Sequence, residues 1–256
     1  MKKTSPKTLR FLVFILISTI VLSSCTSKKN IIYFQDVKEG TEQESRVSFE
    51  TIFQPDDLLS ITISAFDMEA ARPFNLNSMA ANNSGSNNIN YLINNEGYID
   101  FPILGEIKLG GLKKSDAIQV LKEKLSVYVN NPIVQIEIVN FKITILGEVK
   151  SPGTFTIPNE RLTIIEAIGL AGDLAISGKR NNILVIRDVN FEKSYIRVDL
   201  TKKDIFTSPT YYLKQNDVIY VEPTNTRIQS SSVGANTSLY FPIISMLLTI
   251  YAFIIK

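Results

Sequence analysis

The sequence contains no histidine and only one cysteine among its 256 residues. Without histidine, a Ser–His–Asp triad, a histidine general base and most zinc sites are excluded. A single cysteine excludes a disulfide within the chain and a Cys-x-x-Cys metal or redox pair. An enzyme would have to depend on carboxylates, Ser–Lys pairs or tyrosine. We therefore predict a non-enzymatic protein without a metal or a bound cofactor.

A clustered basic surface is also missing. The formal net charge is +2, from 27 basic and 25 acidic residues, but Lys2, Lys3, Lys7 and Arg10 all precede the first apolar run. Without these four, 23 basic residues stand against 25 acidic ones, a net charge of −2. Nucleic-acid binding needs clustered cations that displace counterions, so we expect no nucleic-acid partner.

Residues 1–24 are predicted to be a lipoprotein signal peptide. The basic head is followed by Phe11–Leu22, twelve mostly apolar residues. This run is too short for a membrane-spanning helix, which needs about 20 residues. It ends in Leu22-Ser23-Ser24-Cys25, which resembles the lipobox of bacterial lipoproteins. We predict that Cys25 carries a covalent lipid with palmitate-type chains; an ordinary signal peptide that ends near a buried cysteine is the alternative.

Residues 25–48 are expected to form a solvated anchor segment, in which Glu39, Glu42 and Glu44 mark contact with water. Several acyl chains, each contributing about 0.8 kcal/mol per buried CH₂, would make the anchoring permanent. In the lipoprotein sorting rule that this sequence resembles, aspartate after the lipidated cysteine favours the inner membrane. Thr26 stands there instead. We expect a mainly periplasmic body held at the outer membrane.

Residues 49–140 alternate between strand and helix patterns. Leu58–Ser64 alternates like a half-buried strand after a Pro-Asp-Asp turn. Residues 91–93 and 98–101 flank the turn sequence Asn94–Gly97 and are expected to pair as a hairpin. Apolar residues at three- and four-residue intervals predict a helix over 115–129. Alternation over 133–139 predicts a strand with one wet face.

Residues 141–222 are dominated by strand patterns. Thr163 and Glu166 have capping-box spacing at the start of a short helix, and Gly172 is placed to end it. The expected strands cover residues 142–149, 154–157, 183–186, 194–198 and 217–221. Because strands outnumber helices and the helices interrupt them singly, the fold class is predicted to be α+β with mixed sheets.

Several segments in this order resemble the Wza-type family of outer-membrane polysaccharide exporters. Residues 53–64 (FQPDDLLSITIS) and 91–138 look like the family's polysaccharide export domain, which we place at 49–140. Residues 142–222, with ITILGEVKSPGTFTI and LKQNDVIYVEP, look like one SLBB domain of the β-grasp type, placed at 141–222. The sequence departs from the family at Lys113, where threonine is frequent, so a helix cap is lost or moves to Ser115. The best-known members have two β-grasp units.

The C-terminal segment is expected to reach a membrane. Residues 223–238 are polar and are predicted to be a linker, and residues 239–255 contain no charge and are predicted to be a transmembrane helix. Ser245, Thr249, Ala252 and Lys256 follow one another at spacings of 4, 3 and 4, so they lie on one helix face. This face would meet a pore or a neighbouring helix, as in the family's helical barrel. A single lipid-embedded anchor is the alternative.

Two carboxylate pairs invite a catalytic interpretation. Asp56–Asp57 and Glu166/Asp173 are more simply explained as turn and cap residues, because neighbours on a strand point to opposite faces. The resemblance instead implies an oligomeric ring that exports capsular or exopolysaccharide, together with an inner-membrane polysaccharide co-polymerase that has tyrosine kinase activity. A periplasmic glycan-binding or scaffold lipoprotein without a pore is the alternative, and a carboxylate-dependent glycan hydrolase is a third possibility.

Overall fold

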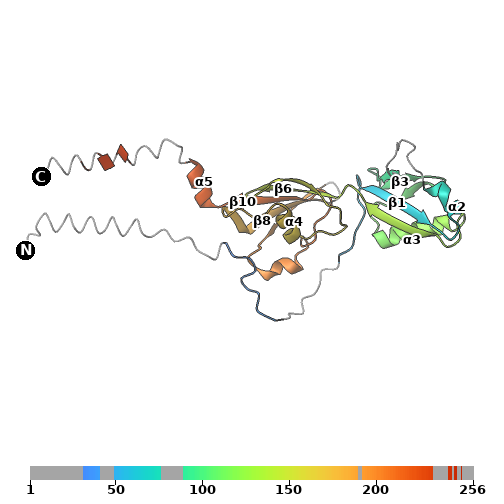
Figure 1. Ribbon diagram of the computed structural model, residues 1–256, viewed down its shortest axis with the longest axis horizontal. Coiled ribbons are helices and arrows are strands. Elements are labelled where there is room, and N and C mark those ends of the chain that lie inside the picture. The colour runs from blue at the N-terminus through green and yellow to red at the C-terminus, as the bar shows by residue number, and fades with distance from the viewer. Residues whose placement is uncertain are drawn as a thin grey trace, which may run out of the picture.

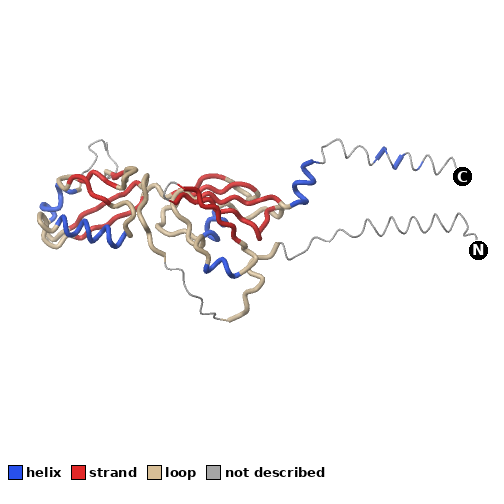
Figure 2. Tube along the Cα trace, turned by 180° about the vertical axis from the view of Figure 1, so that it is seen from behind, coloured by secondary structure: helices blue, strands red, loops and turns tan. Residues whose placement is uncertain are grey.

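The computed structural model describes residues 31–40, 49–75, 89–189 and 192–232, together with Pro242, Ile243, Ser245, Met246 and Thr249. Two groups of strands, each with its own buried core, form two domains that follow each other along the molecule (Figures 1 and 2). Cys25, Ala252 and Lys256 lie outside the described residues.

The first domain is built on a three-stranded antiparallel sheet of order β2-β1-β5. A two-stranded sheet, β3-β4, and the helices complete it. The elements are β1 (Leu58–Ser64), α2 (Met68–Ala71), η2 (Arg72–Phe74), β2 (Asn90–Leu92), β3 (Tyr98–Phe101), β4 (Gly105–Lys108), α3 (Lys114–Leu125) and β5 (Ile133–Ile138).

The alternation of apolar and polar residues predicted for β1 determines which face of this sheet is buried. Leu59, Ile61 and Ile63 of β1 are almost completely buried, and Ile136 of β5 lies beside them. The apolar stripe of α3 covers the same face through Ala117, Leu121 and Leu125. At full burial, each of the leucine and isoleucine side chains contributes roughly 1.5–3 kcal/mol to the stability of this core.

The hairpin predicted for residues 91–93 and 98–101 is wrong. β2 pairs with β1 instead, and β3 pairs with β4. The turn itself is present: the Asn94 side chain accepts hydrogen bonds from the backbone N–H of Glu96 (3.0 Å) and of Tyr98 (2.8 Å). This Asx turn changes the direction of the chain after β2, and β2 and β3 form no ladder with each other. β1 offers β2 a partner that is distant in sequence and that no local pattern reveals.

The start of α3 lacks a side-chain cap. Lys113 occupies the N-cap position without capping the helix, and the Ser115 hydroxyl points to Asp116 Oδ1 (3.4 Å). The cap has therefore been lost and has not moved to Ser115. Helical structure ends at Leu125, earlier than the predicted residue 129, and Tyr128 beyond it packs against Phe74.

The second domain contains a five-stranded mixed sheet of order β7-β6-β10-β8-β9. β6 and β10 are parallel and the other neighbours are antiparallel, so the predicted α+β class with mixed sheets is confirmed. The elements are β6 (Lys142–Gly147), β7 (Gly153–Thr156), α4 (Ile164–Leu170), β8 (Gly178–Val189), β9 (Glu192–Val198), η3 (Lys203–Thr207) and β10 (Val218–Pro223).

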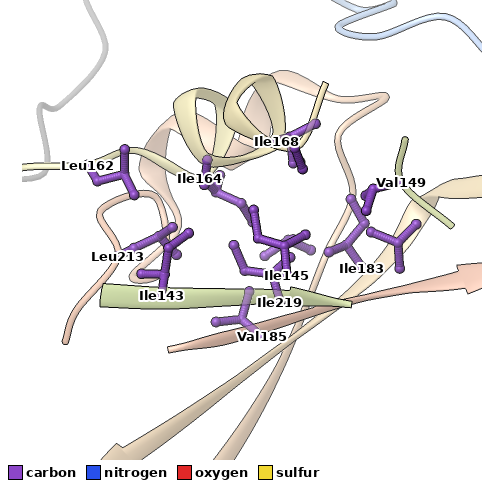
Figure 3. Packing of buried hydrophobic residues seen from close by; sticks show 14 of the residues in the cluster. Ile143, Ile145, Val149, Leu162, Ile164, Ile168, Ile183, Val185, Leu213 and Ile219 are labelled. Atoms are coloured by element: carbon purple, nitrogen blue, oxygen red, sulfur yellow. The ribbon is translucent and has the colours of Figure 1, made fainter. Parts of the chain in front are cut away.

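α4 packs on one face of this sheet. The predicted capping box is confirmed: the Thr163 hydroxyl accepts from the Glu166 N–H (3.2 Å), and Glu166 Oε2 accepts from the Thr163 N–H (2.7 Å). Gly172, at φ +74°, ends the turn after the helix. Figure 3 shows Ile164 and Ile168 of α4 above Ile145, Ile183 and the other isoleucines and valines of the sheet.

Two segments outside the domains differ from the prediction. We call residues 31–40, which were expected to be solvated, the strap. Tyr33 to Asp36 of the strap dock on the second domain, while the side chains of residues 35–40, Glu39 among them, are exposed as expected. Asn225–Ser232, within the predicted linker, form the helix α5. The hydroxyls of Ser230 and Ser231 donate to backbone carbonyls three residues earlier, at 2.8 Å and 2.7 Å, and thus satisfy polar groups within the helix.

The two domains meet at Asn140. Its Oδ1 accepts from the Leu58 N–H (2.9 Å) and its Nδ2 donates to Asp56 O (2.8 Å) in the first domain. From the second domain, Gln215 Nε2 donates to Asn140 O (2.9 Å). A small cavity of about 50 Å³ lies beside this junction and is lined by both domains, with Asp57 and Lys214 among its residues.

Candidate functional site

Both ends of the described chain body leave the second domain at one place. Ile31, at the start of the strap, and residues of α5 line the same cavity of about 770 Å³. The remaining lining comes from β8, from the loop before it and from Thr224, which precedes α5. Amides, hydroxyls and two cations predominate: Ser177, Lys179, Asn181, Asn182, Thr224, Asn225, Thr226, Arg227 and Ser230, with Ile176.

Glu222 lies behind this cavity and holds two of its lining residues, Lys179 and Asn182. Its Oε2 accepts from Lys179 Nζ (3.1 Å) and Asn182 Nδ2 (2.9 Å), and its Oε1 accepts from Arg197 Nη1 (2.8 Å). Hydrogen bonds from Arg197 and Lys179 lower the pKa of the Glu222 carboxyl. Three strand segments, at the ends of β8, β9 and β10, are thus joined through one carboxylate.

Glu148 connects α5 to the loop before β8. Its carboxylate accepts a hydrogen bond from the Ser177 hydroxyl and lies 3.6 Å from Arg227 Nε. The Thr224 N–H donates to Ser177 O (2.7 Å) directly before the helix. Side-chain and backbone contacts therefore fix where the C-terminal helix leaves the sheet.

The strap holds the N-terminal side of the chain on the same domain. The Tyr33 hydroxyl donates to Asp173 Oδ1 (2.5 Å), and the Arg180 guanidinium lies 5.5 Å from the Tyr33 ring centre. Burial and the bond to Asp173 raise the pKa of the Tyr33 hydroxyl. The Phe34 ring stacks on Phe206 at 5.3 Å.

Backbone hydrogen bonds lock the strap further. The Phe34 N–H donates to Leu200 O (3.1 Å) and the Gln35 N–H donates to Thr201 O (2.7 Å). The Asp36 carboxylate accepts from the Lys203 N–H (2.7 Å). The strap therefore joins the second domain through backbone, aromatic and charged contacts, although the first domain is next along the chain.

Comparison with known proteins identifies both domains. Residues 45–139 match the family model "Polysaccharide biosynthesis/export protein", and residues 141–221 match "SLBB domain". This chain belongs to the Wza-type polysaccharide export family. The family resemblance seen in the sequence is thereby confirmed.

Two curated relatives carry the description "EPS I polysaccharide export outer membrane protein EpsA". The relative from Ralstonia solanacearum is 26% identical over 148 residues, which cover 56% of this chain and 39% of the relative. The relative from Ralstonia nicotianae is 27% identical over 101 residues, which cover 38% of this chain and 26% of the relative. The chain therefore matches less than half of the length of these relatives.

The C-terminal residues predicted to face a pore are described only in part. Ser245 and Thr249 are helical and exposed. The Ser245 hydroxyl donates to Pro242 O (2.9 Å), and the Thr249 hydroxyl lies 3.0 Å from Ser245 O and 2.8 Å from Met246 O. Among the described residues, no helix is long and apolar enough to cross a membrane. Most of the predicted span, residues 239–255, lies outside them.

The carboxylate pairs have structural roles. Asp56 adopts φ +69° in the turn before β1, and Asp57 Oδ2 accepts from the Gln54 N–H (2.8 Å). Glu166 caps α4, and Asp173 accepts from Tyr33 and from the Leu174 N–H. Within the described ranges, no three His, Cys, Asp or Glu residues are grouped to hold a metal ion.

Sequence reasoning missed the strap contacts and the Glu222 network. Tyr33 and Phe34 end a short apolar run, residues 31–34, that lies between Asn30 and Gln35, and such a run is a usable signal for docking. Glu222, Lys179 and Arg197 come from three separate strands, so no spacing in the sequence connects them.

Proposed function

We propose that this chain is an outer-membrane lipoprotein subunit of an oligomeric channel that exports capsular or exopolysaccharide from the periplasm to the cell surface. The membership in the export family and the description of the two relatives as polysaccharide export outer membrane proteins support this function. The chain's role is to bind and enclose, without covalent chemistry.

The observation that carries the proposal is the common exit of both chain ends. Ile31 and α5 line one cavity at one end of the second domain. Five residues lie between Cys25 and Ile31, and the six residue steps from one to the other span at most about 20–22 Å in an extended chain. A lipid on Cys25 would therefore hold this end close to the membrane surface. The predicted helix at 239–255 would enter the same membrane from the same end.

This arrangement suits a ring. With the second domain next to the outer membrane, the first domain points into the periplasm, where an inner-membrane co-polymerase with tyrosine kinase activity would meet it. Subunits held by the same membrane at the same end are aligned, and repeated head-to-tail contacts close such subunits into a ring.

The alternative is a periplasmic glycan-binding or scaffold lipoprotein that forms no pore. The cavity of about 770 Å³ favours it, because amide and hydroxyl side chains in a cavity of this size suit a hydroxyl-rich ligand. Binding at this cavity requires neither a ring nor a membrane-spanning helix.

Electron microscopy of the detergent-extracted full chain distinguishes the two functions. The channel subunit should appear as rings with a central opening, and deletion of the protein should stop the appearance of polysaccharide at the cell surface. Monomers only, combined with unchanged export after deletion, would exclude the channel. A full-length variant with Cys25→Ser serves as the control that separates loss of anchoring from loss of assembly.

A further inference from the structure

The wall of the cavity between the strap and α5 offers hydrogen-bond donors and two cations. Lys179 and Arg227 line it together with amides and hydroxyls, and among the described residues its lining includes no carboxylate and no aromatic ring. Ammonium, guanidinium, amide and hydroxyl groups all donate to anionic oxygens such as those of a phosphate. An aromatic ring, on which the face of a sugar could stack, is missing from this lining. The wall therefore suits a phosphate better than a neutral glycan.

Both cations are paired from behind but keep donors for a ligand. Lys179 Nζ donates to Glu222 Oε2 (3.1 Å), and an ammonium group has three N–H donors. Arg227 approaches Glu148 through Nε, at 3.6 Å, so its two terminal nitrogens have no carboxylate partner within the described ranges. A guanidinium fork of this kind binds phosphate oxygens through two parallel hydrogen bonds. Because the two carboxylates balance the two cations, donor geometry rather than net charge favours the phosphate.

Exposed isoleucines border the same cavity. In the part of the strap, second domain and α5 that the structure describes, the exposed isoleucines are Ile32, Ile176 and Ile228, at 52%, 80% and 50%. Ile176 lines the cavity, Ile32 follows Ile31 of the lining, and Ile228 belongs to α5. The other exposed large apolar residues of the second domain lie on its sheet or at the end of α4: Leu146, Leu170, Tyr195 and Tyr220. Isoleucine is among the residues most often buried, so three exposed ones around one cavity indicate an apolar partner.

Two predicted membrane attachments flank the cavity. Six residue steps lead from Ile31 back to Cys25, the predicted lipid site, and span at most about 20–22 Å. Seven steps lead from Ser232, the end of α5, to residue 239, where the predicted membrane helix begins, and span at most about 23–25 Å. Figure 1 shows α5 at the end of the second domain that lies away from the first domain. With both attachments in place, the cavity lies between them and close to the membrane surface.

We propose that the cavity and its three bordering isoleucines form a membrane seat. The cavity holds the phosphate of a phospholipid headgroup, and Ile32, Ile176 and Ile228 enter the boundary between headgroups and acyl chains, as the apolar faces of interfacial segments do. The seat fixes the orientation of the second domain on the membrane, which two extended tethers alone would leave free. This inference rests on the membrane anchoring in the proposed function and names the surface that meets the lipid.

Fluorescence quenching tests the position of the seat. Ile176→Cys and Ile228→Cys, each labelled with bimane in the full-length protein, are placed in nanodiscs of phosphatidylethanolamine and phosphatidylglycerol with spin-labelled headgroups. Apolar side chains of an interfacial segment lie about 5–10 Å into the boundary region, so both fluorophores should be quenched relative to nanodiscs without spin label. Ile133→Cys, at an isoleucine of the first domain that is 64% exposed, is the matched control and should keep its fluorescence.

The results separate the seat from the channel function. Unquenched fluorophores at 176 and 228 would overturn the seat, even in a protein that forms rings. Quenching at 133 as strong as at 176 would also overturn it, because the membrane would then contact both domains alike. Quenching at 176 and 228 alone, in a protein that forms no rings, would support the seat and exclude the channel. Bimane on the parent protein would reveal a free Cys25 thiol and overturn the lipid anchor together with the seat.

Recognition of the headgroup is tested on the detergent-extracted full chain, titrated with phosphatidylethanolamine and followed by native mass spectrometry. Arg227→Gln removes the guanidinium and should raise the Kd for the lipid about tenfold or more, because hydrogen bonds to charged groups have effects of this size. Arg72→Gln is the matched control. Arg72 is exposed and lies 3.6 Å from Glu69, as Arg227 lies 3.6 Å from Glu148, and its variant should bind lipid like the parent protein.

Competition identifies the occupant of the cavity. An unchanged Kd in Arg227→Gln would overturn the headgroup site. Inorganic phosphate that displaces the lipid at equal concentration would indicate a site for the free anion. Displacement by the exported polysaccharide, purified from the producing cells, would assign the cavity to the glycan-binding function. Either displacement would overturn the seat, whereas lipid that both competitors leave in place would support it.

Discussion

Arg187 and Asp217 form a bidentate ion pair inside the second domain. Arg187 Nη2 lies 2.6 Å from Asp217 Oδ2, and Arg187 Nε lies 2.9 Å from Oδ1. Both side chains are buried. The guanidinium also donates to the carbonyl oxygens of Pro209 (3.2 Å) and Tyr212 (3.0 Å). One side chain of β8 therefore fixes the connection that precedes β10.

Removal of one partner should be costly. Asp217→Ala leaves the Arg187 charge buried without its counter-ion, and we expect the free energy of unfolding to fall by about 3–5 kcal/mol. Lys193→Ala breaks an ion pair whose side chains are about half exposed, so it should cost less than about 1 kcal/mol. Urea unfolding followed by circular dichroism measures both variants. Equal losses would contradict the role given to the buried pair.

Asp57 should make stability depend on pH. Its side chain is buried, and among the described residues its Oδ1 has no hydrogen-bond partner. Burial raises the pKa of the Asp57 carboxyl to about 6; the neighbouring Asp56 adds to the shift, and the Gln54 N–H opposes it. The folded chain therefore binds more protons than the unfolded chain between about pH 4 and 6. Within this window, the contribution of Asp57 to the free energy of unfolding falls as the pH rises.

Asp57→Asn removes the cost of burying an ionised carboxylate, and its neutral amide oxygen can still accept the hydrogen bond from the Gln54 N–H. At pH 7 we expect the free energy of unfolding to rise by about 1–3 kcal/mol, and the fall between pH 4 and 6 should become shallower. Asp56→Asn is the control, because asparagine tolerates the positive φ at this position. Unfolding curves at pH 4, 5, 6 and 7 give the result, and a decrease in stability at pH 7 for Asp57→Asn would refute the assignment.

The strap should detach when its aromatic contacts are removed. Phe34→Ala deletes the ring stacked on Phe206, and Tyr33→Phe removes the donor to Asp173. We expect amide hydrogen exchange at Phe34 and Gln35 to rise by about tenfold or more in Phe34→Ala, since the docked backbone bonds then open more often. Val37→Ala alters an exposed side chain of the strap and should leave exchange unchanged. Exchange that stays at the parent rate in Phe34→Ala would show that the backbone bonds alone hold the strap.

Local patterns in the sequence predict the elements whose causes are local. The alternation of Leu58–Ser64 depends on one buried face, and the capping box depends on Thr163 and Glu166, two residues three positions apart. The hairpin prediction failed because β2 pairs with β1, whose paired residues lie 30 to 34 positions earlier in the sequence. Asn140 and Gln215 join the domains across 75 residues of sequence, so no spacing connects them.

The face of the five-stranded sheet that lies away from α4 had a partial signal in the sequence. Ile183–Ile186 is an uninterrupted apolar run, and such runs occur in strands that are covered on both faces. Only the register of four strands shows that Leu184 and Ile186 join Tyr220, Leu146 and Tyr195 in one surface. The residues are visible in the sequence, but their neighbours across the sheet are not.

Lipidation of Cys25 is testable by metabolic labelling. Cys25 lies outside the described residues, and the prediction depends on the sequence Leu22-Ser23-Ser24-Cys25. Cys25→Ser should abolish incorporation of labelled palmitate and leave an uncleaved or released precursor. Ser24→Ala retains a small residue before the cysteine and should still be labelled. Undiminished label in Cys25→Ser would exclude the lipoprotein assignment.

The C-terminal helix gives the most direct distinction between a channel and a scaffold. Ser245 and Thr249 are helical, with hydroxyls bonded to carbonyl oxygens one turn earlier, and they share a predicted face with Ala252. If this face lines a water-filled lumen, cysteine at 245, 249 or 252 should react with a small water-soluble thiol reagent in the assembled protein, with Cys25 kept as the lipidated anchor. Cysteine at 244, 248 or 255 is the matched control and should stay unreactive against lipid or a neighbouring helix.

Charge gives a second readout at the same position. Thr249→Asp should be tolerated when residue 249 faces water, but it should cost about 2.5–3.5 kcal/mol at the centre of a helix that lipid surrounds. Because the lipid on Cys25 holds the other end on the periplasmic side, Lys256 should react with an amine reagent that is added to whole cells and does not cross the membrane. Labelling of all six cysteine positions to the same extent, or of none, would make residues 239–255 a second anchor and would favour the scaffold function.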